Sequence, residues 1–309
     1  MKPKIVVVGS SNTDMIVNVP RIPHPGETVL GGEFTTAAGG KGANQAVAAA
    51  RAGGDVTLIA CVGGDMFGQR AVEGFARDGI HVEYVARSGC RPSGVALIFV
   101  SAEGQNSIAV APGANALLSP ADVRRAAGAF DGASALLMQL ETPLSTVAEA
   151  ARVARRQGVA VILNPAPAQE LPGELLRRVS ILTPNESEAS ALSGITVRDE
   201  ASAAKAAAKL RQRGAGAVIV TLGARGAFVA DAQTGQLVGG FRVKPVDTTA
   251  AGDVFNGALA VALGEGRSLL EAARFANAAA AISVTRRGAQ PSAPTRREIE
   301  RLLKTGRAS

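Results

Sequence analysis

Aromatic residues, cysteine and histidine are all scarce in this chain of 309 residues. Aromatic side chains make up 3% of the sequence, Trp is absent, and there are two cysteines and two histidines. Cys61 and Cys90 do not form a CxxC motif, and His24 and His81 bring too few companions to complete a zinc site. The sequence therefore excludes a disulfide scaffold, a redox pair and a zinc site, and it predicts free cysteines in the reducing cytoplasm.

Long hydrophobic runs are also missing. The longest apolar stretches, such as Ala258–Leu263 and Ala276–Val284, are far shorter than the roughly 20 residues that span a bilayer. Met1–Val8 is not followed by a signal-peptide core and cleavage site, so we expect no membrane segment. No GxSxG motif is present, which argues against Ser-His-Asp chemistry. With 47% hydrophobic residues, the chain is long enough for one large domain or two unequal ones.

Acidic residues are fewer than basic ones, and the formal net charge is +7. Such a balance can indicate nucleic-acid binding, but that would require clustered basic residues or basic residues interleaved with aromatics. The arginine pairs are instead scattered, mostly through Ala-rich segments where solvated helix faces are expected. The pairs are Arg124-Arg125, Arg155-Arg156, Arg177-Arg178, Arg286-Arg287 and Arg296-Arg297. We therefore predict no nucleic-acid partner.

Short β-branched and apolar runs alternate with Ala-rich helical patterns along most of the chain. This alternation predicts an α/β fold with a mostly parallel central sheet and helices on both faces. The predicted strands are Lys4–Gly9, Val56–Val62, Ala135–Leu140, Val159–Leu163, Ile181-Leu182 and Ala217–Leu222. The predicted helices are Ala43–Ala52, Met66–Asp78, Pro120–Ala129, Leu144–Gln157, Glu186–Leu192, Glu200–Arg213, Asp253–Leu263, Leu269–Thr285 and Thr295–Lys304.

Two segments interrupt this alternation and predict strand-turn-strand units. Met15–Phe34 contains MIVNVP and ETVLGGEF, and Ser93–Ala111 contains GVALIFV and NSIAV. Neither unit is followed by a helix that could cover it. We expect a single domain over 1–309, with a small β lid formed from about 15–39 and 93–111. Because unpaired strand edges invite association, the lid also predicts a homodimer.

The first cluster with a chemical interpretation is Asp247–Asp253, with the sequence DTTAAGD, before a helical pattern. A turn of small residues that opens a helix directs free N–H groups at one point, where the helix dipole favours an anion. One interpretation is an ordinary acidic residue at a helix N-terminus. The other is an anion hole for a phosphoryl group, with Asp253 as the base for an attacking hydroxyl.

A second helix-opening turn, Gly39–Gln45, carries Lys41 and Asn44. It does not match the GxxxxGK[ST] motif of a P-loop, and a simple glycine turn is the alternative. Its Lys and Asn donors suit sugar hydroxyls or phosphate oxygens. Asn12, Asp14 and Glu141 follow predicted strands; each is weak evidence alone, but together they predict a polar cup for a sugar.

A third group follows the later strands. Asn185–Glu188 opens a helix after Thr183-Pro184, which is also an ordinary helix entry. The glycine turn Gly223–Gly226 follows the strand Ala217–Leu222, and glycines there allow a nucleotide to approach the backbone. These residues therefore predict a nucleotide site beside the sugar cup.

These motifs together resemble the ribokinase-like (PfkB-type) carbohydrate kinase family over essentially the whole chain. The resemblance is carried by GSSNTDMIVNVPRIPHPGET, GGKGANQAVAAARAGG, Asn185-x-x-Glu188, TLGARGA, DTTAAGDVFNGALA and FANAAAAISVTRRGAQPS, in that order. It implies a three-layer α/β/α domain with a β lid that pairs with the lid of a second subunit. It also implies an ATP-dependent sugar kinase.

The resemblance implies a role for each matching residue. Asp253 is the catalytic base, and Ala250, Ala251 and Gly252 form the anion hole. Ribose is held by Asn12, Asp14, Gly40, Lys41, Asn44 and Glu141, together with Asp253. ATP contacts Asn185, Thr221, Gly223, Gly226, Gly252 and Asn277, while Glu188 helps to order Mg²⁺ and the phosphates. A potassium ion (K⁺) is held by Asp247, Thr249, Ser283, Arg286, Gly288 and Ser292, several of them through backbone carbonyls.

The expected reaction is therefore phosphorylation of D-ribose at O5 by ATP, giving D-ribose 5-phosphate and ADP. The GGKGANQA turn is similar to that of the ribose-phosphorylating members rather than to those acting on fructose or adenosine. Two alternatives remain at this stage: a kinase of the same family acting on deoxyribose or a nucleoside, and a protein that binds a sugar or nucleotide without turnover. An intact Asp253 after an intact small-residue turn argues against the second.

Overall fold

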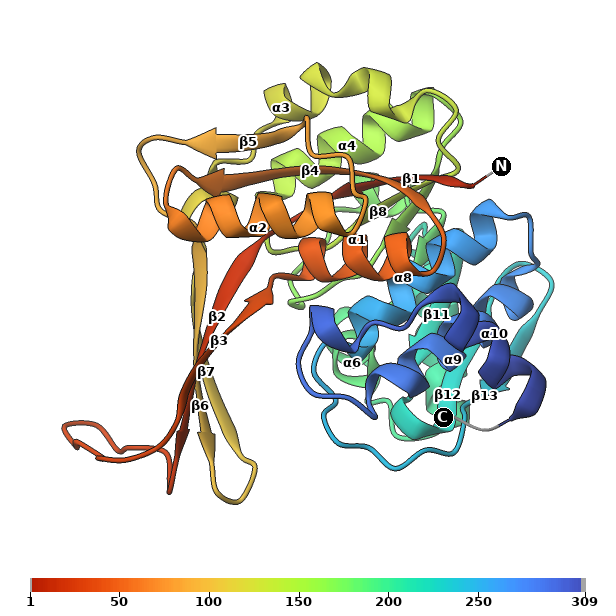
Figure 1. Ribbon diagram of the computed structural model, residues 1–309. Helices are drawn as coiled ribbons and strands as arrows, with labels where there is room; N and C mark the ends of the chain where they lie inside the picture. The colour runs from red at the N-terminus through yellow and green to blue at the C-terminus, as the bar shows by residue number, and fades with distance from the viewer. Residues whose placement is uncertain (1, 307–309) are drawn as a thin grey trace.

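A computed structural model describes residues 2–306, and its main element is a sheet of nine strands (Figure 1). From one edge to the other the strands are β13 (Gly235–Gly239), β12 (Gly226–Ala230), β11 (Ala217–Thr221), β10 (Ile181–Leu182), β9 (Ala160–Leu163), β8 (Ala135–Met138), β1 (Lys4–Val8), β4 (Asp55–Gly63) and β5 (Val85–Ser88). Only β12 runs antiparallel to its two neighbours. The predicted mostly parallel sheet is confirmed.

Strand β1 shows why such apolar runs form a sheet that is covered on both faces. Ile5 and Val7 belong to one hydrophobic cluster, whereas Val6 and Val8 belong to the other. All four side chains are at most 1% exposed. Successive residues of a strand point to opposite faces, so a continuous apolar run stabilises a strand only where helices cover both sides.

Helices cover the two faces and complete the predicted three-layer α/β/α architecture. One layer contains α1 (Lys41–Arg51), α2 (Met66–Arg77), α8 (Ala251–Gly264), α9 (Leu269–Ser283) and α10 (Arg296–Thr305). The other contains α3 (Pro120–Arg125), α4 (Leu144–Arg156), the short α5 (Gly173–Leu176), α6 (Glu186–Ser193) and α7 (Glu200–Gln212). In the described residues no helix is long and apolar enough to cross a membrane.

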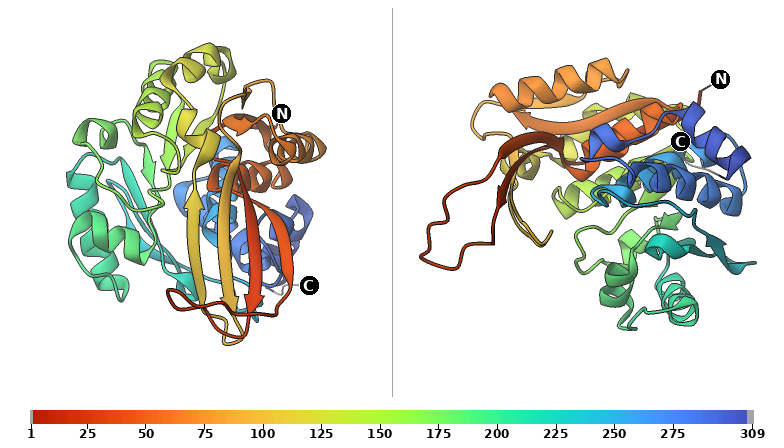
Figure 2. Two further views of the ribbon diagram at one scale, coloured as in Figure 1. Left: turned by 90° about the vertical axis from the view of Figure 1, so that its left-hand side faces the viewer. Right: turned by 60° about the horizontal axis from the view of Figure 1, so that its bottom comes forward.

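A second, four-stranded sheet projects from one side of this body (Figures 1 and 2). Its order is β3 (Phe34–Gly39), β2 (Asn12–Val19), β6 (Gly94–Ser101) and β7 (Asn106–Ala111). Strand β2 pairs in parallel with β6, which joins the two segments that interrupt the α/β alternation. The outer pairs, β2 with β3 and β6 with β7, are antiparallel hairpins.

One predicted strand of this small sheet is wrong. The sequence ETVLGGEF was expected to be a strand, but residues 22–33 lie outside any strand, and β3 starts only at Phe34. Gly31 and Gly32 have φ angles of 100° and 116°, and a Cβ on Gly32 would lie 1.6 Å from the carbonyl oxygen of Asn18. Such backbone angles are open to glycine but not to a regular strand, so pairing resumes after the two glycines.

Strands β5, β12 and β13 were not predicted, although they complete both edges of the large sheet. The run in β12, Gly226–Ala230, is buried throughout. Its five-residue length falls at the lower limit of a buried apolar strand, and it follows the previous strand after only a short turn. The apolar signal was therefore present, although only Gly226, the last residue of the predicted glycine turn, was given a role.

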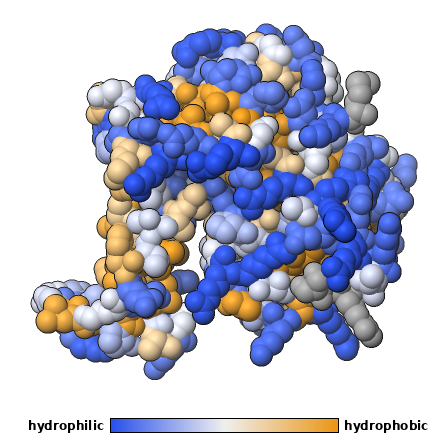
Figure 3. Space-filling model, in the orientation of Figure 1, coloured by the Kyte–Doolittle hydropathy of each residue, from blue (hydrophilic) through white to orange (hydrophobic). Residues whose placement is uncertain are grey.

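The small sheet carries apolar side chains on both faces, and Figure 3 shows hydrophobic surface along this projection. Alternation and register place Met15, Leu97 and Phe99 on one face, and Ile98, Ile108 and Val110 on the face that also carries Asp14. Leu97 is 50% exposed and Ile108 is 54% exposed. A sheet that leaves large apolar residues exposed on both faces is incompletely buried in a single chain.

Five of the ten arginines in the scattered pairs form salt bridges with acidic residues. Arg124 contacts Glu149, Arg125 contacts Asp122, and Arg178 contacts Glu174 within hydrogen-bond distance. These pairs lie on helix surfaces and contribute little individually. The geometry agrees with the solvated helix faces expected from the sequence, while the absence of a nucleic-acid partner stays a prediction.

Candidate active site

Polar residues gather beyond the carboxyl ends of four strands of the parallel sheet. Asn12 and Asp14 lie just after β1, and Glu141 follows β8. Asn185 follows β10, and Thr221 ends β11. Because these strands run parallel in one sheet, their carboxyl ends meet at one edge, which is the usual ligand position in open α/β folds.

Asp253 lies in the first turn of α8, and only 6% of its surface is exposed. Each of its carboxylate oxygens accepts one side-chain hydrogen bond: Asn44 Nδ2 donates to Oδ2 at 3.0 Å, and Gln45 Nε2 donates to Oδ1 at 2.9 Å. Burial raises the pKa of Asp253, although Lys41 and the two amide donors act in the opposite direction. Asp253 is therefore a carboxylate that is fixed by two hydrogen bonds and is more basic than a solvated one.

The turn before Asp253 has the geometry of an anion site. Ala250 adopts a φ of 59°, and it is the sole non-glycine residue with positive φ between residues 2 and 306. The first helical i to i−4 bond runs from Val254 N to Ala250 O, so the preceding N–H groups of Gly252 and Asp253 remain at the helix N-terminus. Apart from its chain neighbours and the backbone of α8, no described atom lies within 4 Å of a Cβ placed on Gly252, so the space on that side of the turn is open.

Lys41 begins α1 and is the positive charge among four carboxylates. Burial lowers the pKa of Lys41, but the charges of Asp253, Glu141, Glu188 and Asp14 together raise it above the usual value. Glu141 Oε2 accepts hydrogen bonds from Ser10 Oγ at 2.5 Å and from the backbone N of Lys41 at 3.0 Å. These contacts bring the predicted sugar residues and the predicted base together in one charged cluster.

Asp14 is the member of this cluster that belongs to the small sheet. Burial, reinforced by the charges of Glu141 and Asp253, raises its pKa to about 6, and Lys41 acts in the opposite direction. Asn12, two residues earlier on β2, accepts a hydrogen bond from Asn115 Nδ2 at 2.7 Å through Oδ1. The projecting sheet thus contributes directly to the polar cup that the sequence predicted.

The glycines around Lys41 allow α1 to approach the end of β1 closely. A Cβ on Gly42 would lie 2.4 Å from Ser10 N and 2.5 Å from Gly9 C. Gly40 has a φ of 88°, and a Cβ there would lie 2.6 Å from Asn12 N. Both positions face backbone atoms, which cannot move aside, so only glycine fits. Gly42 therefore serves packing, which places Lys41 and Asn44 beside the strand ends.

The residues predicted to contact a nucleotide form a neighbouring group. Asn185 and Thr221 are paired through a β-bridge, and Asn277 Nδ2 donates to the carbonyl of Val238 at 3.0 Å. The bond from Asn277 ties α9 to β13, and Gly226 pairs with Gly239 in the hairpin of β12 and β13. Gly223, in the short 3₁₀ turn Gly223–Arg225, has a φ of 57° and is exposed.

Glu188 links this group to the charged cluster. It completes a capping box with Asn185: Glu188 Oε2 accepts from Asn185 N at 2.9 Å, and Asn185 Oδ1 accepts from Glu188 N at 2.8 Å. Burial raises the pKa of Glu188, and its carboxylate interacts electrostatically with Lys41 and Asp253. The capping box is the ordinary start of a helix, as the alternative interpretation expected. Here it also fixes the carboxylate of Glu188 near the charged cluster.

Three members of the predicted cation loop are joined by hydrogen bonds from backbone N–H groups to the carboxylate of Asp247. Asp247 Oδ2 accepts from Gly288 N at 2.8 Å, and its Oδ1 accepts from Thr249 N at 2.8 Å. The side chains of the other members are engaged locally: Ser283 bonds Ala280 O, Arg286 bonds Glu298, and the buried Ser292 bonds Ala289 O. Any shared ligand here must therefore rely on backbone oxygens for most of its contacts.

Several buried polar residues of the site were not singled out from the sequence. They bond predicted residues or one another, and they are Ser10, Gln45, Asn115, Gln139, Asn164, Thr183 and Asn256. The available signal was a polar residue inside an otherwise apolar pattern, as in Asp253-Val254-Phe255-Asn256. Such a residue is buried only with a partner, but the identity of the partner depends on strands far away in the sequence.

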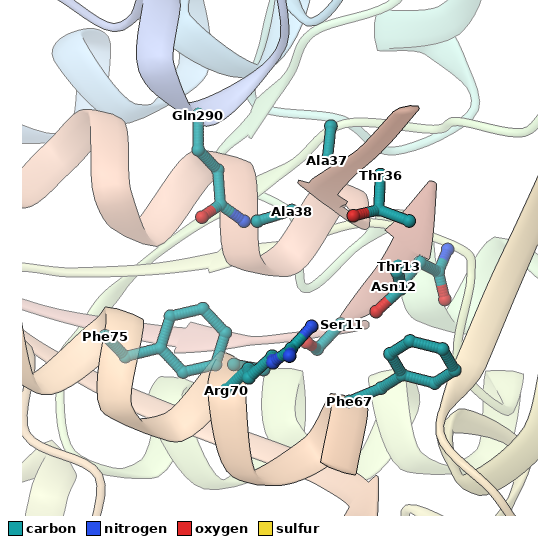
Figure 4. A pocket seen from close by; sticks show the side chains of 11 residues that line it. Ser11, Asn12, Thr13, Thr36, Ala37, Ala38, Phe67, Arg70, Phe75 and Gln290 are labelled. Carbon is teal, nitrogen blue, oxygen red and sulfur yellow. The ribbon is translucent and has the colours of Figure 1, made fainter. Parts of the chain in front are cut away.

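A separate pocket of about 120 Å³ lies between the small sheet and α2. Figure 4 shows Phe67, Arg70 and Phe75 of α2 on one side of it and Gln290 on the other. Asn12 contributes to the lining, but Asp14, Lys41 and Asp253 do not. The pocket is therefore distinct from the charged cluster.

Comparison with known proteins identifies similar chains. A model of the pfkB family of carbohydrate kinases matches residues 2–296. A ribokinase from Haemophilus influenzae is 48% identical over 303 residues, which cover 98% of this chain and 99% of that protein. A deoxyribokinase from Salmonella typhi is 38% identical over 300 residues, with 97% and 98% coverage. The solved structure of Arabidopsis thaliana ribokinase with ribose and ATP matches with a TM-score of 0.91 at 36% identity, covering 98% of this chain and 99% of that one.

Proposed function

Because this chain belongs to the pfkB family of carbohydrate kinases and is an ATP-dependent sugar kinase of the ribokinase type, we propose that Asp253 is the base that activates the 5-hydroxyl of D-ribose. One observation carries this proposal: a buried carboxylate with both oxygens held lies directly after the open turn Ala250–Gly252. The proton acceptor and the N–H groups for the transferred phosphoryl group thus occupy one helix end.

The reaction follows from this placement. The 5-oxygen of ribose forms a bond to the γ-phosphorus of ATP as its proton passes to Asp253. The bond between the γ-phosphorus and the bridging oxygen breaks, and ADP leaves. The free N–H groups at the start of α8 stabilise charge on the transferred group. Phosphoryl transfer depends mainly on positioning and charge stabilisation, so a carboxylate is a sufficient base.

The sugar is held by the cluster around Lys41. The carboxylates of Asp14 and Glu141 accept hydrogen bonds from sugar hydroxyls, and Asn44 reaches the same space. The buried Asn44 Oδ1 has no hydrogen-bond partner among residues 2–306, which is the state expected of an atom that awaits a ligand. Asn12 and Gly40 complete the enclosure.

ATP is placed across the group that contains Asn185, Thr221, Gly223, Gly226 and Asn277. No cluster of three or more His, Cys, Asp or Glu suited to a metal ion occurs among the described residues. This fits Mg²⁺, which usually retains several waters and binds through substrate phosphates and one or two carboxylates. Bound Mg²⁺ would neutralise phosphate charge, and Glu188 would help to order the metal and the phosphates.

The loop formed by Asp247, Thr249 and Gly288 suits a monovalent cation. Its donors are backbone carbonyls and a carboxylate, the hard oxygen ligands that K⁺ binds. Asp247 is held by the two backbone N–H bonds described above, and Val246 N and Asp247 N both donate to Val284 O, at 2.7 and 3.2 Å. Because the loop leads straight into Ala250, a bound cation would add positive potential beside the anion turn.

We therefore expect K⁺ to activate the enzyme. Turnover of ribose with saturating Mg-ATP should rise several-fold when NaCl is replaced by KCl at constant ionic strength, because the larger ion matches a loop of carbonyls. An initial-rate titration of KCl measures this. Equal rates in NaCl and KCl would remove the cation role from this loop, while leaving the role of Asp253 in place.

The small sheet is proposed to act as a lid and a dimer interface. It brings Asp14 to the sugar, and its exposed apolar faces favour pairing with a second copy. Closure of the lid would exclude water from the γ-phosphoryl group and so limit hydrolysis of ATP.

The two free cysteines, Cys61 and Cys90, are in keeping with the cytoplasmic location expected from the sequence.

A substrate panel tests the reaction. We expect ADP release with D-ribose to exceed that with 2-deoxyribose, fructose and adenosine, in a coupled assay run at equal sugar concentrations. The Salmonella typhi deoxyribokinase at 38% identity makes deoxyribose the second candidate. If kcat/KM is higher with deoxyribose than with ribose, deoxyribose is the substrate. If no ADP is released with any member of the panel, the kinase activity itself is contradicted.

A further inference from the structure

A continuous chain of hydrogen bonds between buried side chains connects Asp253, the proposed base, to the anion turn Ala250–Gly252. Gln45 Nε2 donates both to Asp253 Oδ1 at 2.9 Å and to Asn164 Oδ1 at 3.2 Å. Asn164 Nδ2 donates to the carbonyl of Thr183 at 3.1 Å. Thr183 Oγ1 donates to Asn256 Oδ1 at 2.6 Å.

The chain ends on the anion turn. Asn256 Nδ2 donates to the carbonyl of Gly252 at 2.8 Å. Gln45, Thr183 and Asn256 are each at most 2% exposed, and Asn164 is 7% exposed. The chain therefore leaves Asp253, crosses the carboxyl ends of β9 and β10, and returns to the residue next to Asp253. Each of its links joins different segments of the fold except the last, which lies within α8.

The chemistry of the groups fixes the direction of these bonds. An ionised carboxylate can only accept hydrogen bonds, so the atom of Gln45 that faces Asp253 must be its amide nitrogen. The oxygen of Gln45 then faces away and accepts from Gln139 Nε2 at 2.6 Å. A Cβ on Gly9 would meet Gln139 Oε1 at 2.2 Å, so Gln139 packs closely against the end of β1. The amide of Gln45 cannot turn over without losing both contacts.

This arrangement favours the ionised form of Asp253 in one orientation. Two amide donors from α1, Asn44 and Gln45, each bind a different oxygen and oppose the effect of burial on its pKa. The charged groups that face Asp253 from the other packed elements are Lys41, Glu141, Asp14 and Glu188. Gln45 and Asn44 are the neutral members of this surrounding.

We propose that the chain Gln45–Asn164–Thr183–Asn256 is a positioning network that fixes the base and the anion turn relative to each other. Gln45 orients the carboxylate of Asp253, and Asn256 holds the carbonyl of Gly252 so that the N–H groups at the start of α8 keep their direction. This inference rests on the proposed function of Asp253. None of the four residues is placed in contact with the sugar or the nucleotide.

The central test compares Gln45→Met with Thr146→Val. Methionine keeps the length of the side chain but removes the donor to Asp253. Thr146 is fully buried in α4 and donates to the carbonyl of Leu118 at 2.6 Å, far from the site in the opposite helix layer. Thr146→Val thus removes one buried hydrogen bond with little change in shape, and it controls for loss of stability alone.

For Gln45→Met we expect kcat to fall about 10- to 100-fold with KM for ribose nearly unchanged, since a small misplacement of a reacting group has effects of this size. In a plot of kcat against pH, the acidic limb, where activity is lost as the pH falls, should move to higher pH by about one unit. The reason is that the pKa of Asp253 rises when it loses a donor. Thr146→Val should lower Tm while leaving kcat and the acidic limb as in the wild type. An unshifted limb in Gln45→Met, whatever happens to Tm, overturns the proposal.

Two further variants separate the two ends of the network. Gln45→Glu keeps the size of the side chain and places a second carboxyl against Asp253, so the acidic limb should move further upward than in Gln45→Met. Asn256→Leu removes the bonds to Gly252 and Thr183 but leaves both amide donors on Asp253, so it should lower kcat without moving the limb. A wild-type limb in a folded Gln45→Glu enzyme contradicts the network even if Gln45→Met does not fold.

The assay also distinguishes failure of the network from failure of the proposed base. If Asp253→Asn is inactive while Gln45→Met and Asn256→Leu match the wild type in kcat and limb, the base stands and the network does not. If Asp253→Asn is fully active, the assignment of the base is wrong, and the network has no catalytic group to position.

Discussion

Replacing Asp253 with Asn should lower kcat for ribose by about 10³-fold, the middle of the range that a positioned general base contributes. The amide cannot accept the proton of the 5-hydroxyl, whereas the N–H groups at the start of α8 are unchanged. Binding of ribose should be largely kept, because Asp14, Lys41 and Glu141 remain. Initial rates, with ribose affinity from isothermal titration calorimetry, measure the two effects separately.

The Asp253→Asn variant should fold normally, for a reason visible in the hydrogen bonds. The introduced amide would accept from Gln45 through its oxygen and present its NH₂ group to Asn44. Asn44 can turn its own amide over, since its buried Oδ1 lacks a partner in the described structure. Burial raises the pKa of Asp253 in the folded state, so its ionised form destabilises the fold at neutral pH, and the neutral amide removes that cost. Tm should therefore stay level or rise.

The matched control for this experiment is Asp55→Asn. Asp55 contacts His81 Nε2 at 2.8 Å at the start of β4, which is the end of the sheet away from the site. This substitution removes the same charge from another position, and it should leave kcat unaltered. Near-wild-type turnover in Asp253→Asn would show that another group takes the proton, and the proposed mechanism would fail.

Lys41→Met should lower kcat/KM for ribose by about 100-fold or more, comparable to the loss of a charge-stabilising donor. Lys41 is the cation that opposes four carboxylates, and its charge lowers the pKa of Asp253, Asp14 and Glu188. Without it those pKa values rise. Asp14, with a pKa of about 6 in the native enzyme, and Asp253 would then hold protons at higher pH. Protonated Asp14 would be a weaker acceptor for sugar hydroxyls, and protonated Asp253 could not act as a base.

The sign of the pH dependence makes this prediction specific. Loss of Lys41 should move the acidic limb of kcat/KM upward, so that activity recovers partly as the pH is raised. Lys209→Met, which removes a charge on the exposed face of α7, should leave the profile unchanged. A Lys41→Met enzyme with the wild-type limb would show that its ammonium group does not control the protonation of these carboxylates.

The catalytic residues and the supporting residues differ in how far sequence could identify them. Asp253, Lys41 and Glu141 were expected at one site because each follows a strand or opens a helix at the carboxyl edge of a parallel sheet. Gln45 lies in the same motif as Lys41, yet no pattern indicated that its partners are Gln139 and Asn164. Those partners are 94 and 119 residues away in the chain, and strand order alone brings them together.

The cation loop is a prediction of an intermediate kind. The family resemblance implied that Asp247 and Gly288 share one site, and the structure joins them by a hydrogen bond. It also shows that the side chains of Ser283, Arg286 and Ser292 bond elsewhere. A carbonyl oxygen is present at every residue, so a motif of side chains cannot reveal which backbone oxygens converge.

The sequence by itself determined the α/β layers, the helix-opening turns at Lys41 and Asp253, and the chemistry of the cluster around them. These features depend on local periodicity and on backbone geometry within a few residues. Tertiary structure decided where β3 begins, why Gly42 must lack a side chain, and how Gln45 and Asn256 support Asp253 and Gly252. Each of these depends on contacts between segments far apart in the chain, and a linear pattern does not encode which atoms meet when distant strand ends are packed at one edge of a sheet.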